Sequence, residues 1–276
     1  MPEANMTGNY IGRIEIRAMW GHKHIVWNLR PDVNILSGMN GAGKSTILNL
    51  VAERLDRLSE GSVKNGPDEE VSFVFSPEGA EMVNYDVIRS IDRPLMHSNL
   101  LEKMADNNVV TELDWQIYRL QRRYLDYQVN IGNRTISYLT SGTPEMMAKA
   151  AELSRPRMHF LNLIDELFAD SGKTIVRDSN DLQFDRFGIR LLPYDLSSGE
   201  KQLLVVLLTT LVQDNRPGVI LMDEPEVSLD VDWQQQLIEL IMKINPNVQI
   251  ILTTHSPALI MNGWVDRVTE VSEIEA

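Results

Sequence analysis

One nine-residue segment, Gly38–Thr46, constrains the fold of this chain more than any other part of the sequence. It reads GMNGAGKST and matches the pattern G-x-x-x-x-G-K-[ST], in which glycines let backbone N–H groups turn inward around phosphate oxygens. An apolar strand is expected before it at Val33–Leu36, and an amphipathic helix after it at Ser45–Leu58. This order of strand, glycine loop and helix predicts an α/β fold with a phosphate site at the helix start.

The residue types in this loop assign tasks to individual side chains. Lys44 is expected to reach the β- and γ-phosphates of a nucleotide, and Ser45 to hold Mg²⁺. The remaining contacts to the phosphates are expected from Asn40, Gly41, Ala42, Gly43 and Thr46.

A second motif places two carboxylates at the end of an apolar strand. The segment Gly218–Pro225 reads GVILMDEP, and the carboxyl ends of parallel strands collect the sites of α/β folds. Asp223 is therefore expected to bind Mg²⁺, usually through water, and Glu224 to polarise the attacking water.

A third motif, Leu196–Gln202 (LSSGEKQ), has the local features of a helix start. Ser197 is expected to cap the helix, and Glu200 three residues later completes a capping box. The N-terminus of a capped helix also attracts anions, so the structural role does not exclude a contact with phosphate.

The rest of the chain alternates strands and helices. Strands are expected at 10–19 and 24–29, a β-hairpin at 71–75 and 82–91, and short strands at 174–176 and 189–191. After a mainly helical stretch from about 98 to 167, a βαβ rhythm returns over 200–252, which predicts a parallel sheet covered by helices. We therefore expect a P-loop NTPase fold with a mainly parallel central sheet, an N-terminal antiparallel β subdomain and an inserted helical subdomain. In this interpretation residues 1–276 form one domain, with the insert at about 98–170.

The three motifs together resemble those of the ABC-type ATPases. In that family the signature helix of one subunit closes over the γ-phosphate bound to the other, which implies nucleotide contacts from Ser197, Ser198, Gly199 and Glu200. Ser198 replaces the first glycine of the family signature, and Glu200 is more typical of chromosome-maintenance (SMC) and repair ATPases than of transporters. Ser228–Asp230 matches the family's D-loop at the dimer interface. His255, in Thr253–Pro257, matches the switch histidine that contacts the γ-phosphate.

The resemblance is strongest to the compact, OLD-like or SMC-like ATPases. It implies an ATP hydrolase that uses ATP and Mg²⁺, with Glu224, His255 and Lys44 as catalytic residues. It also implies a homodimer, or a heterodimer with a related ATPase, that switches a separate protein effector, often a nuclease in bacterial defence or repair. The alternatives are the nucleotide-binding subunit of a membrane transporter and a P-loop kinase of a small metabolite. Against the transporter stand the long insert, Glu200 and the lack of a clean Q-loop, for which Gln116 is a candidate.

The composition limits the choice of partners. The formal net charge of −13 argues against a generally basic nucleic-acid surface. Arg119, Arg122, Arg123 and Arg134 leave open a local docking patch for a partner or a nucleic-acid backbone, beside the simpler interpretation as a solvated helix face. Near the first strands, Arg17, Trp20 and His22 are candidates for contact with adenine, and Trp20 is equally expected as a core or turn residue.

Targeting and membrane signals are not evident in the sequence. The first ten residues lack the basic and apolar regions of a signal peptide, and the most apolar run, Leu203–Val212, is too short to span a bilayer. The chain has no cysteine, which excludes disulfides and thiolate metal sites. We expect a soluble, cytoplasmic protein without direct membrane insertion.

Overall fold

The computed structural model describes residues 6–66, 69–90 and 108–276. The chain divides into two compact units, one made of residues 1–90 and 215–276 and the other of residues 91–214. The predicted insert at about 98–170 falls in the second unit, and its first part, 98–107, lies outside the described residues. The second unit extends to residue 214 because helix α5 (Ser198–Val212) packs against α2 (Glu112–Thr140) and α4 (Arg155–Leu167).

The first unit is built around a parallel sheet, as the βαβ rhythm predicts. In the described residues its strand order is β13-β4-β12-β11-β7. The register sets Leu36 of β4 opposite Thr253 of β12, and Thr253 opposite Asp223 of β11. The carboxyl ends of the three central strands therefore lie side by side. The strand bounds are β4 Val33–Ser37, β7 Tyr85–Arg89, β11 Gly218–Asp223, β12 Val248–Thr253 and β13 Val268–Glu270.

An antiparallel sheet forms the predicted N-terminal β subdomain. Its order is β3-β2-β5, with β2 at Tyr10–Met19, β3 at Lys23–Asn28 and β5 at Val71–Ser76. Helix α1 (Lys44–Ser59) contacts strands of both sheets, so its apolar residues share one core with them. That core includes Ile14, Trp27, Ile47, Val51, Leu221 and Ile251.

The prediction of a β-hairpin over 71–75 and 82–91 is wrong. Strand β5 pairs with β2 in the antiparallel sheet, whereas β7 pairs with β11 in the parallel sheet. The connection is longer than a hairpin turn and contains β6 (Met82–Val83), which pairs with β1 (Thr7–Gly8). Both segments have strand character, but pairing with buried neighbours decided which sheet each one joined.

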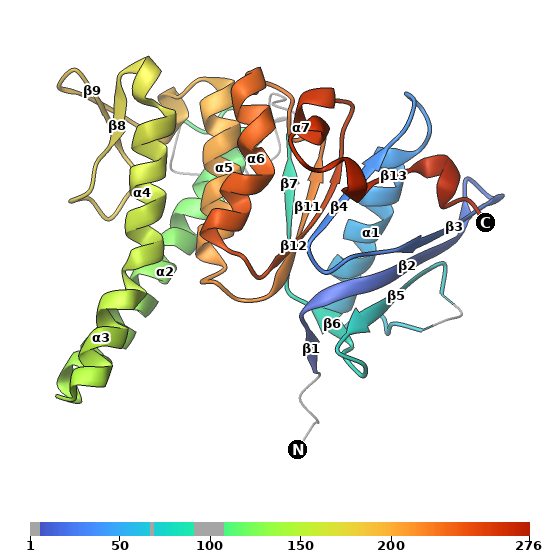
Figure 1. The fold of residues 1–276 in the computed structure, drawn as a ribbon, viewed down its shortest axis with the longest axis horizontal. Coiled ribbons are helices and arrows are strands. Elements are labelled where there is room, and N and C mark those ends of the chain that lie inside the picture. The colour runs from blue at the N-terminus through green and yellow to red at the C-terminus, as the bar shows by residue number, and fades with distance from the viewer. Residues whose placement is uncertain (1–5, 67–68, 91–107) are drawn as a thin grey trace. The chain divides into compact units, whose positions relative to one another are not determined.

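Two helices cover the parallel sheet from opposite faces. Figure 1 shows α1 on one side of the sheet and α6 (Val231–Ile244) on the other. The buried side of α6 is apolar, with Leu237, Ile241 and Ile244 among its residues. The short helix α7 (Pro257–Met261) follows β12 and packs on α6.

The second unit is mainly helical, as predicted for the insert, and carries a small antiparallel sheet. Its helices α2 and α5 pack together, and α3 (Pro144–Leu153) contacts both α2 and α4. The sheet has the order β10-β9-β8, with β8 at Lys173–Ile175, β9 at Phe184–Arg186 and β10 at Ile189–Leu191. Helix α2 has 29 residues and lies within the stretch of about 98 to 167 that the sequence predicts as mainly helical.

No helix in the described residues is long and apolar enough to cross a bilayer. Helix α5, which contains the most apolar run of the sequence, is buried on all sides within the protein.

Candidate functional site

The glycine loop lies between β4 and α1, as its sequence predicts. Gly38, Gly41 and Gly43 have φ angles of 150°, 80° and 107°, a backbone region that other residues rarely adopt. Gly43 precedes α1, and no side chain caps the helix. The N–H groups of the first turn therefore remain available to an anion.

Lys44 is almost fully buried inside this loop, with 4% of its surface exposed. Its ammonium group donates hydrogen bonds to the carbonyl oxygens of Gly38 (3.0 Å) and Met39 (3.3 Å). It also lies 2.6 Å from Nε2 of His255. The structure thus brings a cation to the interior of the loop, where a phosphate oxygen can replace the weaker carbonyl acceptors.

A hydroxyl and a carboxylate meet beside the loop. Ser45 Oγ donates to Asp223 Oδ1 at 2.9 Å, and Thr253 Oγ1 donates to the same oxygen at 2.5 Å. Oxygen donors of these two kinds are the ligands that Mg²⁺ accepts, usually completed by water and phosphate oxygens. The residues present therefore fit a magnesium ion held between Ser45 and Asp223.

Glu224 and His255 approach each other at the ends of β11 and β12. His255 Nε2 lies 3.3 Å from Glu224 Oε1 as well as 2.6 Å from Lys44 Nζ. One ring nitrogen cannot accept a proton from Lys44 and donate one to Glu224 at the same moment. The three groups lie around one point, where a phosphate oxygen could accept from Lys44 and His255 and leave the Glu224 carboxylate able to accept from a water.

The backbone of Glu224 is held in an unusual conformation, with φ at 48°. Its N–H donates to both the carbonyl and the hydroxyl oxygen of Thr253, each at 3.1 Å. Strain of this kind persists where the surroundings fix it, and it clusters at functional sites. Here it directs the side chain away from the strand and toward His255.

Sequence reasoning did not single out Glu226, which links the two loops. This buried carboxylate accepts hydrogen bonds from Thr254 Oγ1 (2.5 Å) and from the N–H of His255 (3.0 Å). Ser256, next to this pair, donates to Gln234 of α6 at 2.6 Å. Glu226 thus fixes the segment that carries His255. Its position three residues after Asp223 was the available signal, but a loop carboxylate is usually solvated.

Trp20 lies against the glycine loop. A Cβ added at Gly43 would lie 3.0 Å from the Trp20 ring, so the ring covers the point where α1 begins. Half of Trp20 is exposed, and Lys23 Nζ lies 5.8 Å from the ring centroid. Trp20 lies in the turn after β2, with a φ of 57°, so the prediction of a core or turn residue is confirmed for the turn and a buried position is excluded. Its ring is exposed beside the loop, and its contact with adenine stays a prediction.

The segment Ser228–Asp230, predicted as the D-loop, leads into α6. Ser228 has a φ of 73°, and Asp230 caps α6 by accepting from the N–H of Trp233 at 2.8 Å. The local structure therefore explains Asp230 as a helix cap.

The signature motif lies in the second unit and forms the predicted capping box. Ser197 Oγ accepts from the N–H of Glu200 at 3.3 Å, and Glu200 Oε2 accepts from the N–H of Ser197 at 2.9 Å. Ser197 and Ser198 are exposed at the start of α5, whereas Gly199 and Glu200 are buried. The exposed part of the motif is thus limited to its two serines.

Glu200 is enclosed by partners that the sequence did not indicate. Lys173 donates to both of its carboxylate oxygens at 2.7 and 3.0 Å, and Ser171 donates at 2.7 Å. Burial alone would raise the pKa of Glu200, but the hydrogen bonds from Lys173, Ser171 and Ser197 hold it below the ordinary value. In this structure Glu200 holds the helix start in place from the inside.

A hollow of about 550 Å³ opens beside Ser197. Phe187, on the turn between β9 and β10, has a φ of 54° and is 84% exposed. This hairpin was only partly predicted, and its exposed ring had no signal in the sequence. The hollow is lined by Lys173, Arg186, Phe187, Ile189, Leu191, Asp195, Leu196 and Ser197.

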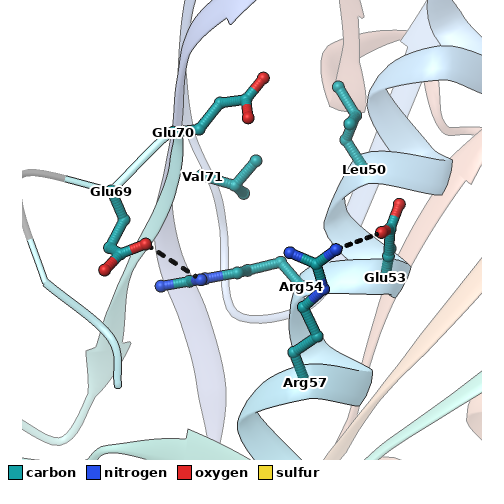
Figure 2. Close-up of a pocket in the computed structure, with 7 residues that line it drawn as sticks. All are labelled: Leu50, Glu53, Arg54, Arg57, Glu69, Glu70 and Val71. Carbon is teal, nitrogen blue, oxygen red and sulfur yellow. Dashed lines mark hydrogen bonds and ion pairs between the residues drawn. The ribbon is translucent and has the colours of Figure 1, made fainter. Parts of the chain in front are cut away.

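A second hollow, of about 170 Å³, lies in the first unit and has paired charges (Figure 2). Arg54 of α1 is buried, binds Glu69 at 3.2 Å and donates to the carbonyl of Lys64 at 2.7 Å. Arg57 pairs with Glu53 at 2.9 Å. The arginines that line this hollow are therefore paired within the protein, and Arg54 ties the segment after α1 to that helix. We keep the glycine loop as the candidate site. The lining residues are Leu50, Glu53, Arg54, Arg57, Glu69, Glu70 and Val71.

Comparisons with known proteins agree with this geometry. Residues 143–262, less than half of the chain, match the family described as "AAA domain, putative AbiEii toxin, Type IV TA system". The "Retron Vc95 probable ATPase" of Vibrio cholerae serotype O1 biovar El Tor is 26% identical over 42% of this chain and 27% of its own length. Septu protein PtuA of Bacillus thuringiensis is 23% identical over 93% of this chain and 74% of its own length.

Among solved structures, an SmcHead bound to the C-winged helix domain of ScpA aligns with a TM-score of 0.52 and 16% identity. The alignment covers 92% of this chain and 91% of that chain, which shows a shared fold. By contrast, the match to the retron ATPase of Vibrio cholerae spans only about a quarter of that relative's length. The chain thus shares its fold with an SMC head, and over part of its length it is similar to an AAA-domain family and to a probable ATPase.

Proposed function

We propose that this ATPase binds ATP and Mg²⁺ in composite sites between two copies of the chain, and that closing of the dimer switches a protein effector. The glycine loop, Ser45, Asp223 and Glu224 supply one half of each site. Ser197 of the opposite copy supplies the other half. The observation that carries this proposal is the cluster of Lys44, Glu224 and His255, in which Nε2 of His255 lies close to both of the other side chains.

The chain's own residues have distinct parts in this reaction. Lys44 binds phosphate oxygens, and Ser45 and Asp223 hold the cation, which when bound neutralises charge that develops on the phosphates. Glu224 orients the attacking water and accepts its proton. His255 donates to a γ-phosphate oxygen. Glu226, in the loop after β11, holds the segment that carries His255 through its hydrogen bonds to Thr254 and His255. Trp20 offers its exposed face to the base.

The second half of the site is supported by the signature turn. Ser197 and Ser198 are exposed at the N-terminus of a 15-residue helix, where a phosphate would be stabilised by the helix dipole. Glu200 and Lys173 fix this turn from within, so the serines are presented without rearrangement. The hollow beside Ser197, with the exposed ring of Phe187, gives a second copy a surface to contact.

The composite site can be tested by complementation. Lys44→Ala removes the phosphate contact, and Ser197→Arg blocks the signature turn, so each variant alone should lose ATP hydrolysis. In a mixture, a heterodimer contains one site with Lys44 from one copy and Ser197 from the other. When the two variants mix at random in equal amounts, half of the dimers have one intact site of two, so we expect about a quarter of the wild-type phosphate release per chain. Ser141→Arg, which changes an exposed serine at the end of α2, is the control and should remain active.

The proposal of a sandwich dimer fails if the mixture is as inactive as its components while both variants remain folded. The effector is tested separately, by purifying the chain with the products of its neighbouring genes, with and without ATP. The resemblance to OLD-like ATPases, together with the retron and Septu relatives, supports a defence or repair effector, with a nuclease as the first kind to examine.

A further inference from the structure

Helix α2 carries a line of exposed apolar residues that no described residue of its own unit covers. Its buried side includes Leu120, Tyr124, Tyr127 and Ile131. On the other side, Leu125, Val129, Ile136 and Leu139 are 41%, 54%, 62% and 50% exposed. Together with Gly132 they form a stripe, here called the α2 stripe, which consists of Leu125, Val129, Gly132, Ile136 and Leu139.

The spacing of the α2 stripe is that of a helix-pairing seam. Successive members are four, three, four and three residues apart, which keeps them on one face of a helix. The centre of the buried face lies about a third of a turn from the centre of the α2 stripe around the helix axis. One helix therefore has two apolar faces, and only one of them is used inside the unit.

Most of the α2 stripe carries little charge along its own helix. Between residues 127 and 140, Arg134 is the one charged residue, whereas Arg122 and Asp126 flank Leu125 at the start of the stripe. Arg134 lies nine residues after Leu125, which is half a turn from the stripe, and it pairs with Asp214 of its own unit. A mainly uncharged surface from Val129 to Leu139 suits another protein surface better than a phosphate backbone, which needs a cluster of cations.

Gly132, at the centre of the stripe, has no explanation within its own unit. Glycine in a helix interior costs about 1 kcal/mol relative to alanine. A Cβ added at Gly132 would meet nothing within 4 Å, so no crowding in the described residues requires its absence. A missing side chain does allow a second helix to approach closely at this point, as small residues do at helix crossings.

We propose that the α2 stripe pairs with the same stripe of a second copy, antiparallel, with a two-fold axis at Gly132. The order of the stripe is nearly the same in both directions, at −7, −3, 0, +4 and +7 from Gly132. An antiparallel pair therefore sets Leu125 opposite the partner's Leu139, and Val129 within one residue of the position opposite the partner's Ile136. A patch that is complementary to itself is what an isologous dimer needs, and only a second copy is certain to carry it.

This contact is separate from the composite ATP site and does not depend on it. Four apolar side chains per copy bury an area at or below about 1,200 Å², the lower limit of stable interfaces, so the pairing alone is weak. When ATP also joins copies through the signature turn, the two contacts reinforce each other by raising the effective concentration. Two different two-fold contacts on one chain join dimers into larger assemblies.

Cross-linking tests the axis directly, because the natural chain has no cysteine. We expect the full chain with Gly132→Cys to form a covalent dimer with a short bis-maleimide in the absence of ATP. Asn130→Cys is the control, since it is exposed and lies two residues, or more than half a turn, away. The yield with Gly132→Cys should exceed the control at least fivefold, and equal yields would overturn the proposal.

A charge exchange tests the pairing and its direction. Val129→Glu or Ile136→Lys alone should lower the association constant at least tenfold, because a charge is buried without a partner. Combined in one chain, the two introduced charges face each other across the axis, and association should return. Sedimentation velocity measures this in the Lys44→Ala background, where ATP-driven dimers are absent, and circular dichroism verifies folding.

If each single change weakens association and the double change does not restore it, the antiparallel pair is wrong. That result would leave the composite ATP site untouched, because complementation between Lys44→Ala and Ser197→Arg does not involve α2. Conversely, a failed complementation with intact cross-linking at Gly132 would remove the sandwich dimer alone.

Discussion

The glycine-loop cluster and the signature turn differ in whether their charged side chains have enough hydrogen-bond partners. In the loop cluster, Nε2 of His255 is the shared partner of Lys44 and Glu224. In the signature turn, every oxygen of Glu200 is taken up by Lys173, Ser171 or Ser197. The first arrangement can be exchanged for a ligand, whereas the second cannot be opened without leaving a buried charge unpaired.

The difference distinguishes a site whose polar groups can change partners from one that fixes the architecture, although both lie in motifs that predict a nucleotide site. Glu224 and Glu200 are both acidic residues of motifs that resemble ATPase motifs. Glu224 is partly exposed and strained, and Glu200 is buried and satisfied. Substitution of the first should change the rate and spare stability, and substitution around the second should do the reverse.

The largest expected effect is on the rate, from Glu224→Gln. Loss of the proton acceptor should reduce ATP hydrolysis by about 10²- to 10⁴-fold, with ATP affinity and unfolding free energy nearly unchanged. Phosphate release and nucleotide binding measure the two quantities. Glu239→Gln, an exposed change on α6, should leave both as in the wild type. Equal activity of the two variants would show that Glu224 is not the acceptor.

The next effect is on stability, from Lys173→Met. The Lys173 and Glu200 side chains are 10% and 4% exposed, so removal of the lysine leaves a buried charge and should cost about 3–5 kcal/mol. Lys149→Met breaks the exposed pair with Glu145 and should leave the unfolding free energy nearly unchanged, because water screens this pair. Urea unfolding measures both. A small loss for Lys173→Met, similar to that of Lys149→Met, would show that Glu200 is not structural.

A smaller effect is expected from acid. The pKa of Glu200 is lowered in the folded state from an ordinary value of 4.5. Burial would raise the pKa of Asp114 too, but hydrogen bonds from Lys201 and backbone N–H groups lower it below 3.8. The unfolded chain binds these protons first, so their contribution is complete above about pH 4.5 and is lost as the pH falls through the folded values.

The matching experiment compares unfolding free energy between pH 6 and pH 3.5. The wild type should lose more stability over this range than the double variant Lys173→Met with Glu200→Met, in which one of the two carboxylates is absent. An identical loss in both proteins would mean that Glu200 titrates normally.

The smallest effect concerns the D-loop. Asp230→Ala removes the cap of α6, and we expect a loss of about 1 kcal/mol of unfolding free energy. If Asp230 acts only as a cap, Asp230→Asn should retain both the stability and the hydrolysis rate. A fall in rate for Asp230→Asn at unchanged stability would show a second role, of the kind expected at a dimer interface.

Much of the fold followed from periodicity. Strand β10 has the predicted bounds, α1 lies within one residue of its predicted bounds, and α5, β11, α6 and β12 follow the βαβ rhythm predicted over 200–252. The failure was the hairpin over 71–91, because strand propensity does not specify a partner strand. From the sequence, Trp20 could be predicted either as a contact of adenine or as a core or turn residue, without a choice between them. Glu226 and Lys173 were missed because their partners lie 28 and 27 residues away.

The sequence by itself determined the glycine loop, the two carboxylates after β11 and the capping box of α5, because each depends on residues within one local segment. Local geometry fixes such motifs through backbone freedom, strand ends and helix caps. Only the tertiary structure decided that Lys44, Asp223 and His255 meet, since that required three parallel strands to align in register. It also decided that Glu200 is enclosed and that one face of α2 remains uncovered, because burial depends on what packs against an element and not on its own pattern.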